Sequence, residues 1–201
     1  MLFRSLLASL FIVSTLFSAS SQYVGVILEG GYDWLKQEPS NASKVKVNPV
    51  VYGAKVNLGI DGGEDVRTNI FFGLQYFDKD FYEYKTNSGG NGSSNQFLYS
   101  VGFNVVKTYR EPRSSVLPYL SGGMDYEFID LKGYAQDWGQ NVGLNFGGGA
   151  FFRMSDGLEF QLGAYYKYRM WGNYNLNTAQ TQNVELSDHS LNVELGLNFH
   201  Y

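Results

Sequence analysis

The most regular feature of this chain is a strict alternation of apolar and other residues in stretches of roughly ten. Between Ser190 and Tyr201, every second residue from Leu191 to Phe199 is large and apolar, and small or polar residues fill the positions between them. A period of two places successive side chains on opposite faces of a β-strand. The same pattern recurs along the chain. It predicts eight strands, over residues 24–34, 50–60, 68–76, 97–105, 118–128, 142–152, 158–170 and 190–201.

The face opposite the apolar one carries two unlike kinds of residue. Twelve glycines fall on it, against three on the apolar face. It also carries charged residues, namely Glu29, Lys55, Asp125, Glu127, Arg153, Glu159, Lys167, Arg169 and Glu194. A sandwich in water would not need so much glycine on its polar face. A small barrel in lipid explains both observations, because its outside faces hydrocarbon and its narrow interior must alternate small residues with long polar ones.

The connections between the predicted strands alternate in length. Three are brief, with the sequences DGGED, REPRSS and SDG, and the other four are longer polar segments such as DKDFYEYKTNSGGNGSSNQ. Short periplasmic turns and long external loops are typical of outer-membrane barrels. In lipid every backbone polar group needs a partner, so the first and last strands must pair. We therefore predict an all-β fold, an eight-stranded antiparallel transmembrane β-barrel with an up-and-down meander and both termini in the periplasm.

The N-terminus has a different composition. Arg4 precedes an apolar stretch from Leu6 to Phe17, and the small residues Ser18, Ala19 and Ser20 follow it. This layout is typical of a secretory signal peptide. The stretch is short for a membrane-spanning anchor, which is the alternative. We expect a signal peptide over residues 1–20 and the outer-membrane barrel over residues 21–201.

The bulk composition excludes several classes of function. The chain has no cysteine, so neither a disulfide nor a thiolate metal site can form. Its formal net charge is −4 and it has no block of basic residues, which argues against nucleic acid as a partner. We expect no cofactor and no bound metal.

The signal peptide, the eight amphipathic strands and the closing LNVELGLNFHY together resemble the outer-membrane protein β-barrel domain family. That group is akin to the transmembrane domain of outer membrane protein A and to the small opacity-type surface barrels. The resemblance implies outer-membrane lipid, lipopolysaccharide and the barrel assembly machinery as partners. It also implies that a final aromatic residue, preceded by apolar residues at alternate positions, is the signal for barrel assembly. The matching residues are Val193, Leu195, Leu197, Phe199 and Tyr201.

Charges that point into a narrow lumen are expected to pair, because an isolated buried charge is costly. The expected pairs are Arg153 with Glu159, Glu29 with Lys55, and Lys167 with Glu194. Two interpretations follow from such a network. It is either a permanent polar plug, which we favour, or a gate that opens when the charges exchange partners.

One short motif raises the alternative of an enzyme. Some eight-stranded barrels are lipid A deacylases with His and Ser two residues apart near the C-terminus, and ELSDHSL places Ser187 and His189 at that spacing in the reverse order. Glu185 has the spacing to orient a base on the same face. We interpret this stretch as a polar loop that leads into a strand, so we expect no enzyme.

The predicted external loops and their bases carry many aromatic residues. We expect Trp34 and Trp171 to anchor the barrel at the membrane interface, and we assign no role to Trp138. The sequence thus favours a structural and surface-interactive barrel that displays four extracellular loops above a narrow polar lumen. The alternatives are a small porin-like channel for ions or small solutes and, third, a lipid A-modifying hydrolase.

Overall fold

Long antiparallel strands form almost all of the described chain. The computed structural model describes residues 21–39, 45–62, 65–78, 84–85, 91–110, 114–132, 137–172, 174–176 and 182–201. The long strands are β1 (Ser21–Pro39), β3 (Val50–Asp61), β4 (Val66–Phe77), β6 (Asn91–Thr108), β7 (Val116–Lys132), β8 (Trp138–Ser155), β9 (Leu158–Trp171) and β11 (Gln182–His200). Three short strands accompany them, namely β2 (Val45–Val47), β5 (Tyr84–Lys85) and β10 (Tyr174–Leu176). None of the described residues forms a helix long and apolar enough to cross a membrane.

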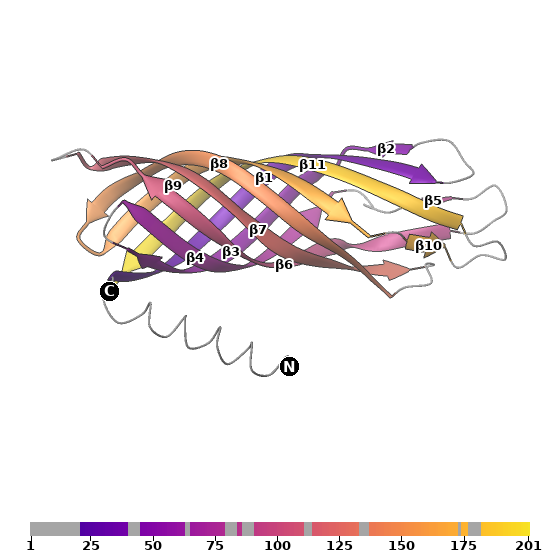
Figure 1. The fold of residues 1–201 in the computed structure, drawn as a ribbon, viewed down its shortest axis with the longest axis horizontal. Coiled ribbons are helices and arrows are strands. Elements are labelled where there is room, and N and C mark those ends of the chain that lie inside the picture. Colours follow the sequence, from indigo (N-terminus) through magenta and orange to yellow (C-terminus); the bar gives the residue numbers. More distant parts are fainter. Residues whose placement is uncertain are drawn as a thin grey trace.

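The eight long strands close into a barrel (Figure 1). Each long strand pairs antiparallel with the next one along the chain, and β11 returns to pair with β1. The closing register joins Val24 to Phe199 and Gly30 to Val193, and the backbone N–H of Tyr201 donates to the carbonyl of Gln22 at 3.0 Å. The predicted eight-stranded up-and-down barrel is confirmed.

The two ends of the barrel differ in their connections. At one end, called the turn end here, β3 meets β4, β6 meets β7, and β8 meets β9. The opposite end, called the loop end, carries the other connections together with β2, β5 and β10 (Figure 1). The alternation of short and long connections is therefore as expected. Residues 1–20, where the sequence indicates a signal peptide, lie outside the described residues.

Several strands are longer at the loop end than the sequence pattern predicted. The pattern placed the last strand over 190–201, but β11 begins at Gln182, and β1 continues to Pro39. The reason is that backbone pairing does not need apolar side chains. Beyond the last outward apolar residues the two strands remain hydrogen-bonded to each other, and the alternation that reveals a strand in the sequence has already ended. The segment 182–189, interpreted from sequence as part of a loop, is a strand.

The outer face of the barrel is apolar on every long strand. Leu28, Phe72 and Phe146 are 61%, 54% and 63% exposed, whereas the residues between such positions point inward and are mostly buried. Soluble proteins rarely expose a contiguous apolar surface of this extent, and an apolar belt of this kind is typical of a barrel in lipid. The assignment of the two faces from sequence is confirmed.

The inward face is less polar than expected. At the loop end, inward apolar side chains meet across the lumen in a cluster, called the apolar cap here. Its members are Leu35, Val51, Phe77, Leu98, Ile129, Leu131 and Leu186. A second apolar cluster lies inside the barrel toward the turn end and comprises Val106, Leu117, Tyr119, Phe151 and Tyr165. The lumen that was predicted to be polar therefore also contains two apolar layers.

A charge on the outward belt should destabilise the barrel more in the middle of the bilayer than near its edge. Leu195→Arg, in the middle of β11, should lower the free energy of unfolding in lipid vesicles by about 2–4 kcal/mol, because it places a charge in hydrocarbon. The control is Met154→Arg, an outward residue at the turn end that is 65% exposed. It should cost about 0–1 kcal/mol. Denaturant unfolding followed by tryptophan fluorescence measures both changes, and equal costs would contradict the assignment of the belt.

Candidate functional site in the barrel lumen

Arg169 is the centre of a charge network inside the barrel. Its side chain is fully buried, and its Nε lies 2.6 Å from Oε2 of Glu127. Nη1 donates to carboxylate oxygens of Asp33 and Asp188 at 3.0 and 3.1 Å. Nη2 donates to Oε1 of Gln75 at 2.8 Å. These four partners come from β7, β1, β11 and β4, so one side chain on β9 links five of the eight strands across the lumen.

Lys167, two residues before Arg169 on the same inward face, extends the network toward β7. Its Nζ lies 2.6 Å from Oδ2 of Asp125 and 2.7 Å from Oε1 of Glu127. Gly143 on β8 makes room for this contact, because a Cβ there would overlap the Asp125 carboxylate. The requirement for glycine at this position is thus steric, as expected for a narrow lumen.

Lys55 holds a second group of carboxylates. Its Nζ lies 2.6 Å from both Oε2 of Glu29 and Oε1 of Glu194. Gln75 joins this group to the first one, because its Nε2 donates to Oε1 of Glu29 at 2.7 Å while its Oε1 accepts from Arg169. The two groups therefore form one continuous hydrogen-bonded network.

The formal charges of this network do not balance. Its described members include three cations, Lys55, Lys167 and Arg169, and six carboxyl groups, Glu29, Asp33, Asp125, Glu127, Asp188 and Glu194. Each cation is consequently shared by at least two acids. Removal of a cation should therefore lower the free energy of unfolding more than removal of an acid does.

A separate ion-pair cluster lies at the turn end. Arg67 is buried, and its Nη1 and Nε lie 2.6 Å from Oε2 of Glu159 and 3.2 Å from Oδ2 of Asp61. Nε2 of His200 approaches the same Glu159 oxygen at 3.0 Å. Arg153 is half-exposed and reaches Glu159 only at 3.9 Å. The inward charges predicted from sequence therefore belong to two groups, with Arg153 and Glu159 in the turn-end cluster.

The predicted pairings have mixed outcomes. The structure brings Glu29 and Lys55 together, and it places Arg153 opposite Glu159 in the register. It does not pair Lys167 with Glu194, and that expectation was wrong. The register of β9 and β11 sets Lys167 opposite Ser190, four positions along β11 from Glu194.

Several network residues were missed in the sequence. Asp33 lies at an inward position of the strand predicted over 24–34, and Arg67 lies one residue before the strand predicted over 68–76. Applying the period of two to every charged residue, and extending that strand by one residue, would have found both. Asp188 was missed because its segment was interpreted as a loop. Gln75 carries no charge, and no sequence signal marks an uncharged residue as the bridge between two ion-pair groups.

Ser187 and His189 share the outward face of β11, while Ser190 points inward. Among the described residues no hydrogen bond joins Ser187 to His189. Instead, the Nδ1 atom of His189 and the hydroxyl of Tyr166 are 2.5 Å apart, and the ring of Tyr168 lies 5.1 Å from the imidazole. The side chain of Glu185 lies outside the described residues. This arrangement is that of an aromatic cluster at the edge of the apolar belt.

The tryptophans occupy three different environments. Trp34 points outward, is 42% exposed and packs edge-on against Tyr32, and its role as an interfacial anchor stays a prediction. Trp171 was expected to anchor the interface as well, but it packs inward against the apolar cap, and its Nε1 donates to Oδ2 of Asp188 at 3.4 Å. The inward phase of Trp171 along β9 explains the difference. Trp138 is 48% exposed and lines a cavity on the outer wall.

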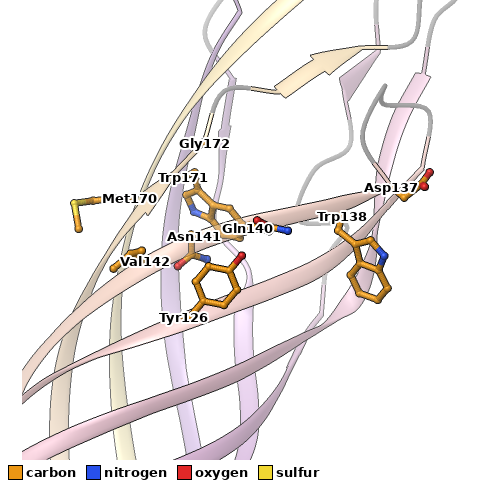
Figure 2. A pocket seen from close by; sticks show the side chains of 9 residues that line it. All are labelled: Tyr126, Asp137, Trp138, Gln140, Asn141, Val142, Met170, Trp171 and Gly172. Carbon is orange, nitrogen blue, oxygen red and sulfur yellow. The ribbon is translucent and has the colours of Figure 1, made fainter. Parts of the chain in front are cut away.

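This cavity, called the loop-end groove here, has a volume of about 670 Å³ and lies where β9 ends beside β8 (Figure 2). It is lined by Tyr126, Asp137, Trp138, Gln140, Asn141, Val142, Met170, Trp171 and Gly172. Figure 2 shows the Trp138 indole and Asp137 set apart from the cluster formed by Tyr126, Gln140, Asn141 and Trp171. The groove is thus bounded by Trp138 and Asp137 on one side and by this cluster on the other.

No family model matches the chain, and no curated protein matches it. Solved structures do match. Neisserial surface protein A is 14% identical, with a TM-score of 0.54 over 88% of this chain and 97% of that one. The outer membrane protein OprG from Pseudomonas aeruginosa is 11% identical, with a TM-score of 0.53 over 88% and 95% of the two chains. The outer membrane protease OmpT from Escherichia coli is 9% identical, with a TM-score of 0.50 over 92% and 100%.

The chain has the fold of the outer-membrane β-barrels. At these identities the likeness concerns the fold alone. Because one of the three structures is a protease, the fold by itself does not decide whether a barrel of this kind is an enzyme.

Because the network has more acids than cations, a cation variant and an acid variant should differ in how much they lower the free energy of unfolding. Arg169→Gln should lower the free energy of unfolding by about 3–5 kcal/mol, because it leaves several buried acids without their cation. Asp33→Asn should cost only about 1 kcal/mol, because the amide oxygen can still accept from Arg169. Both are measured by denaturant unfolding of the refolded barrel in lipid vesicles. Similar costs for the two variants would mean that the acids are not in excess.

Proposed function

We propose that this protein is a bacterial outer-membrane barrel with a closed lumen, and that its role is structural and surface-interactive rather than transport or catalysis. In this proposal the turn end and both termini face the periplasm, and the loop end faces the outside. The apolar belt and the fold shared with outer-membrane proteins support the location.

The observation that carries the proposal is the double closure of the lumen. The cap residues Val51, Phe77, Leu98 and Ile129 come from four different strands, and each has no exposed surface. Next to this cap, the fully buried Arg169 network crosses the lumen. An ion that crossed the barrel would have to pass both an apolar constriction, which excludes water, and a set of paired charges.

A gate is a weaker interpretation of the network than a plug. To open, Arg169 would have to leave Glu127, Asp33 and Asp188 together, and each is a charge-assisted contact in a low-dielectric interior. Lys167 already shares Glu127 with Arg169 and also holds Asp125, and Lys55 holds Glu29 and Glu194, so neither lysine could replace Arg169 without leaving its own acids. The plug also explains why so many strands contribute to one network.

The proposal includes partners. Outer-membrane lipid and lipopolysaccharide would surround the belt, and an extracellular ligand would bind at the loop end. The barrel assembly machinery would recognise the outward residues of the closing strand, namely Val193, Leu195, Leu197, Phe199 and Tyr201, which are all between 40% and 75% exposed. Residues 1–20 would direct export and be removed.

Conductance tests the closed lumen. The refolded protein in a planar bilayer should give no discrete current steps, while a general porin inserted in parallel does. Insertion is checked by co-flotation with vesicles. A variant that changes both layers, Arg169→Gln with Leu98→Ser and Ile129→Ser, should give discrete current steps. Discrete steps from the native protein would overturn the closed-lumen proposal in favour of a small channel.

A charge on the closing strand tests the assembly signal. Tyr201→Asp should reduce the amount of folded barrel in the outer membrane severalfold, because the aromatic end of the signal is lost. The control is Tyr109→Asp, which changes another exposed aromatic residue near the turn end that is not on the closing strand. Quantitative blotting of outer-membrane fractions measures both variants. Normal levels of the Tyr201 variant would count against the signal.

A further inference from the structure

The loop-end groove has no part in the closed lumen or in the assembly signal proposed above. It lies on the outer wall of the barrel, at the edge of the apolar belt, and its volume of about 670 Å³ is in the range of small-molecule sites. We propose that it binds the uncharged sugar headgroup of a glycolipid, with the acyl chain against the barrel wall below. The inference rests on the proposed exposure of the loop end at the outer leaflet.

The position of the groove favours an amphiphile over a free sugar. One side is formed by Tyr126, Val142 and Met170, which are outward residues of β7, β8 and β9. The outward residues that follow on β7 and β8 toward the turn end, Met124 and Leu144, are 40% and 45% exposed and belong to the apolar belt. An acyl chain that begins at the groove therefore has a continuous apolar path along the wall.

The chemistry of the lining favours a sugar over a phosphate. Aromatic rings of Tyr126 and Trp138 can pack against the C–H faces of a pyranose, and the side chains of Asp137 and Gln140 can bond to its hydroxyl groups. Among the described residues that line the groove there is no lysine or arginine, and Asp137 would repel an anion. Phosphate sites, in contrast, are built from cations and convergent N–H donors.

Residues on both sides of the groove are held in place by their neighbours. The ring of Trp138 packs edge-on against Phe128 of β7, with centroids 5.9 Å apart. The carbonyl of Asp137 accepts from the N–H of Leu131 at 2.9 Å. Trp171 packs on the apolar cap. A site whose rings are already ordered loses little conformational entropy when a ligand binds.

The three tryptophans allow a direct test. The protein, labelled with ¹⁵N at its indoles, is placed in phosphatidylcholine nanodiscs and titrated with dodecyl maltoside below the concentration that dissolves the disc. We expect a saturable shift of the Trp138 indole signal. Trp34, on the far side of β11 from β9, should not shift in the same saturable way. Asp137→Ala and Tyr126→Ala should each raise the apparent dissociation constant about tenfold, whereas Tyr32→Ala should leave it unchanged.

Each other outcome overturns a stated part of the proposal. Equal binding of free maltose would show that the acyl chain is not recognised and that the source is a free glycan. An equal shift with dodecylphosphocholine would show that the site does not distinguish a sugar headgroup from phosphocholine. No saturable shift would remove the site altogether. Because both leaflets of a nanodisc are alike, these results do not depend on orientation in the cell, and conductance tests the closed lumen separately.

Discussion

Closure of the sheet between β1 and β11 is the constraint on which the rest of this structure depends. In hydrocarbon no water can satisfy an open strand edge, so the eight strands must form a ring. A ring of eight strands is so narrow that side chains fill it. The need for small residues such as Gly53 and Gly143 beside long inward side chains follows from that width, since a Cβ at either position would collide with Glu29 or Asp125.

The side chains that fill a lumen can be apolar or polar. In this barrel an apolar layer and a charged layer lie one after the other along the lumen. The apolar cap at the loop end needs no partners, but it adds nothing that fixes the position of one strand against another. The charge network does so, because Arg169 has donors at set angles that reach β1, β4, β7 and β11. Burying these charges costs desolvation free energy. Their ion pairs offset that cost only while every cation stays in contact with its acids. We therefore infer that the network contributes more to fixing the register of the strands than to net stability.

Sequence reasoning predicted the fold because the period of two is a local property of each strand. It found the two faces, the number of strands and most inward charges. It predicted the pair of Glu29 and Lys55 but missed other partners, such as Lys55 and Glu194, because the stagger between strands and the reach of the side chains set which charges meet. It also missed the apolar cap, whose members are inward residues near the loop ends of the strands. In the sequence each of them is a single apolar residue on a polar face. They form a cluster only when the strands close into a barrel.

The layers also constrain where function can lie. If Leu98, Ile129 and the Arg169 network close the lumen as proposed, the outer wall and the loop end are the surfaces left open to other molecules. Trp171 connects these two regions, because it lines the loop-end groove while it packs on the cap and bonds to Asp188. The residues that close the barrel therefore also support one wall of the groove. If the lumen is closed and the groove binds a ligand as proposed, the Trp171–Asp188 hydrogen bond links the two features, because it joins a lining residue of the groove to the charge network.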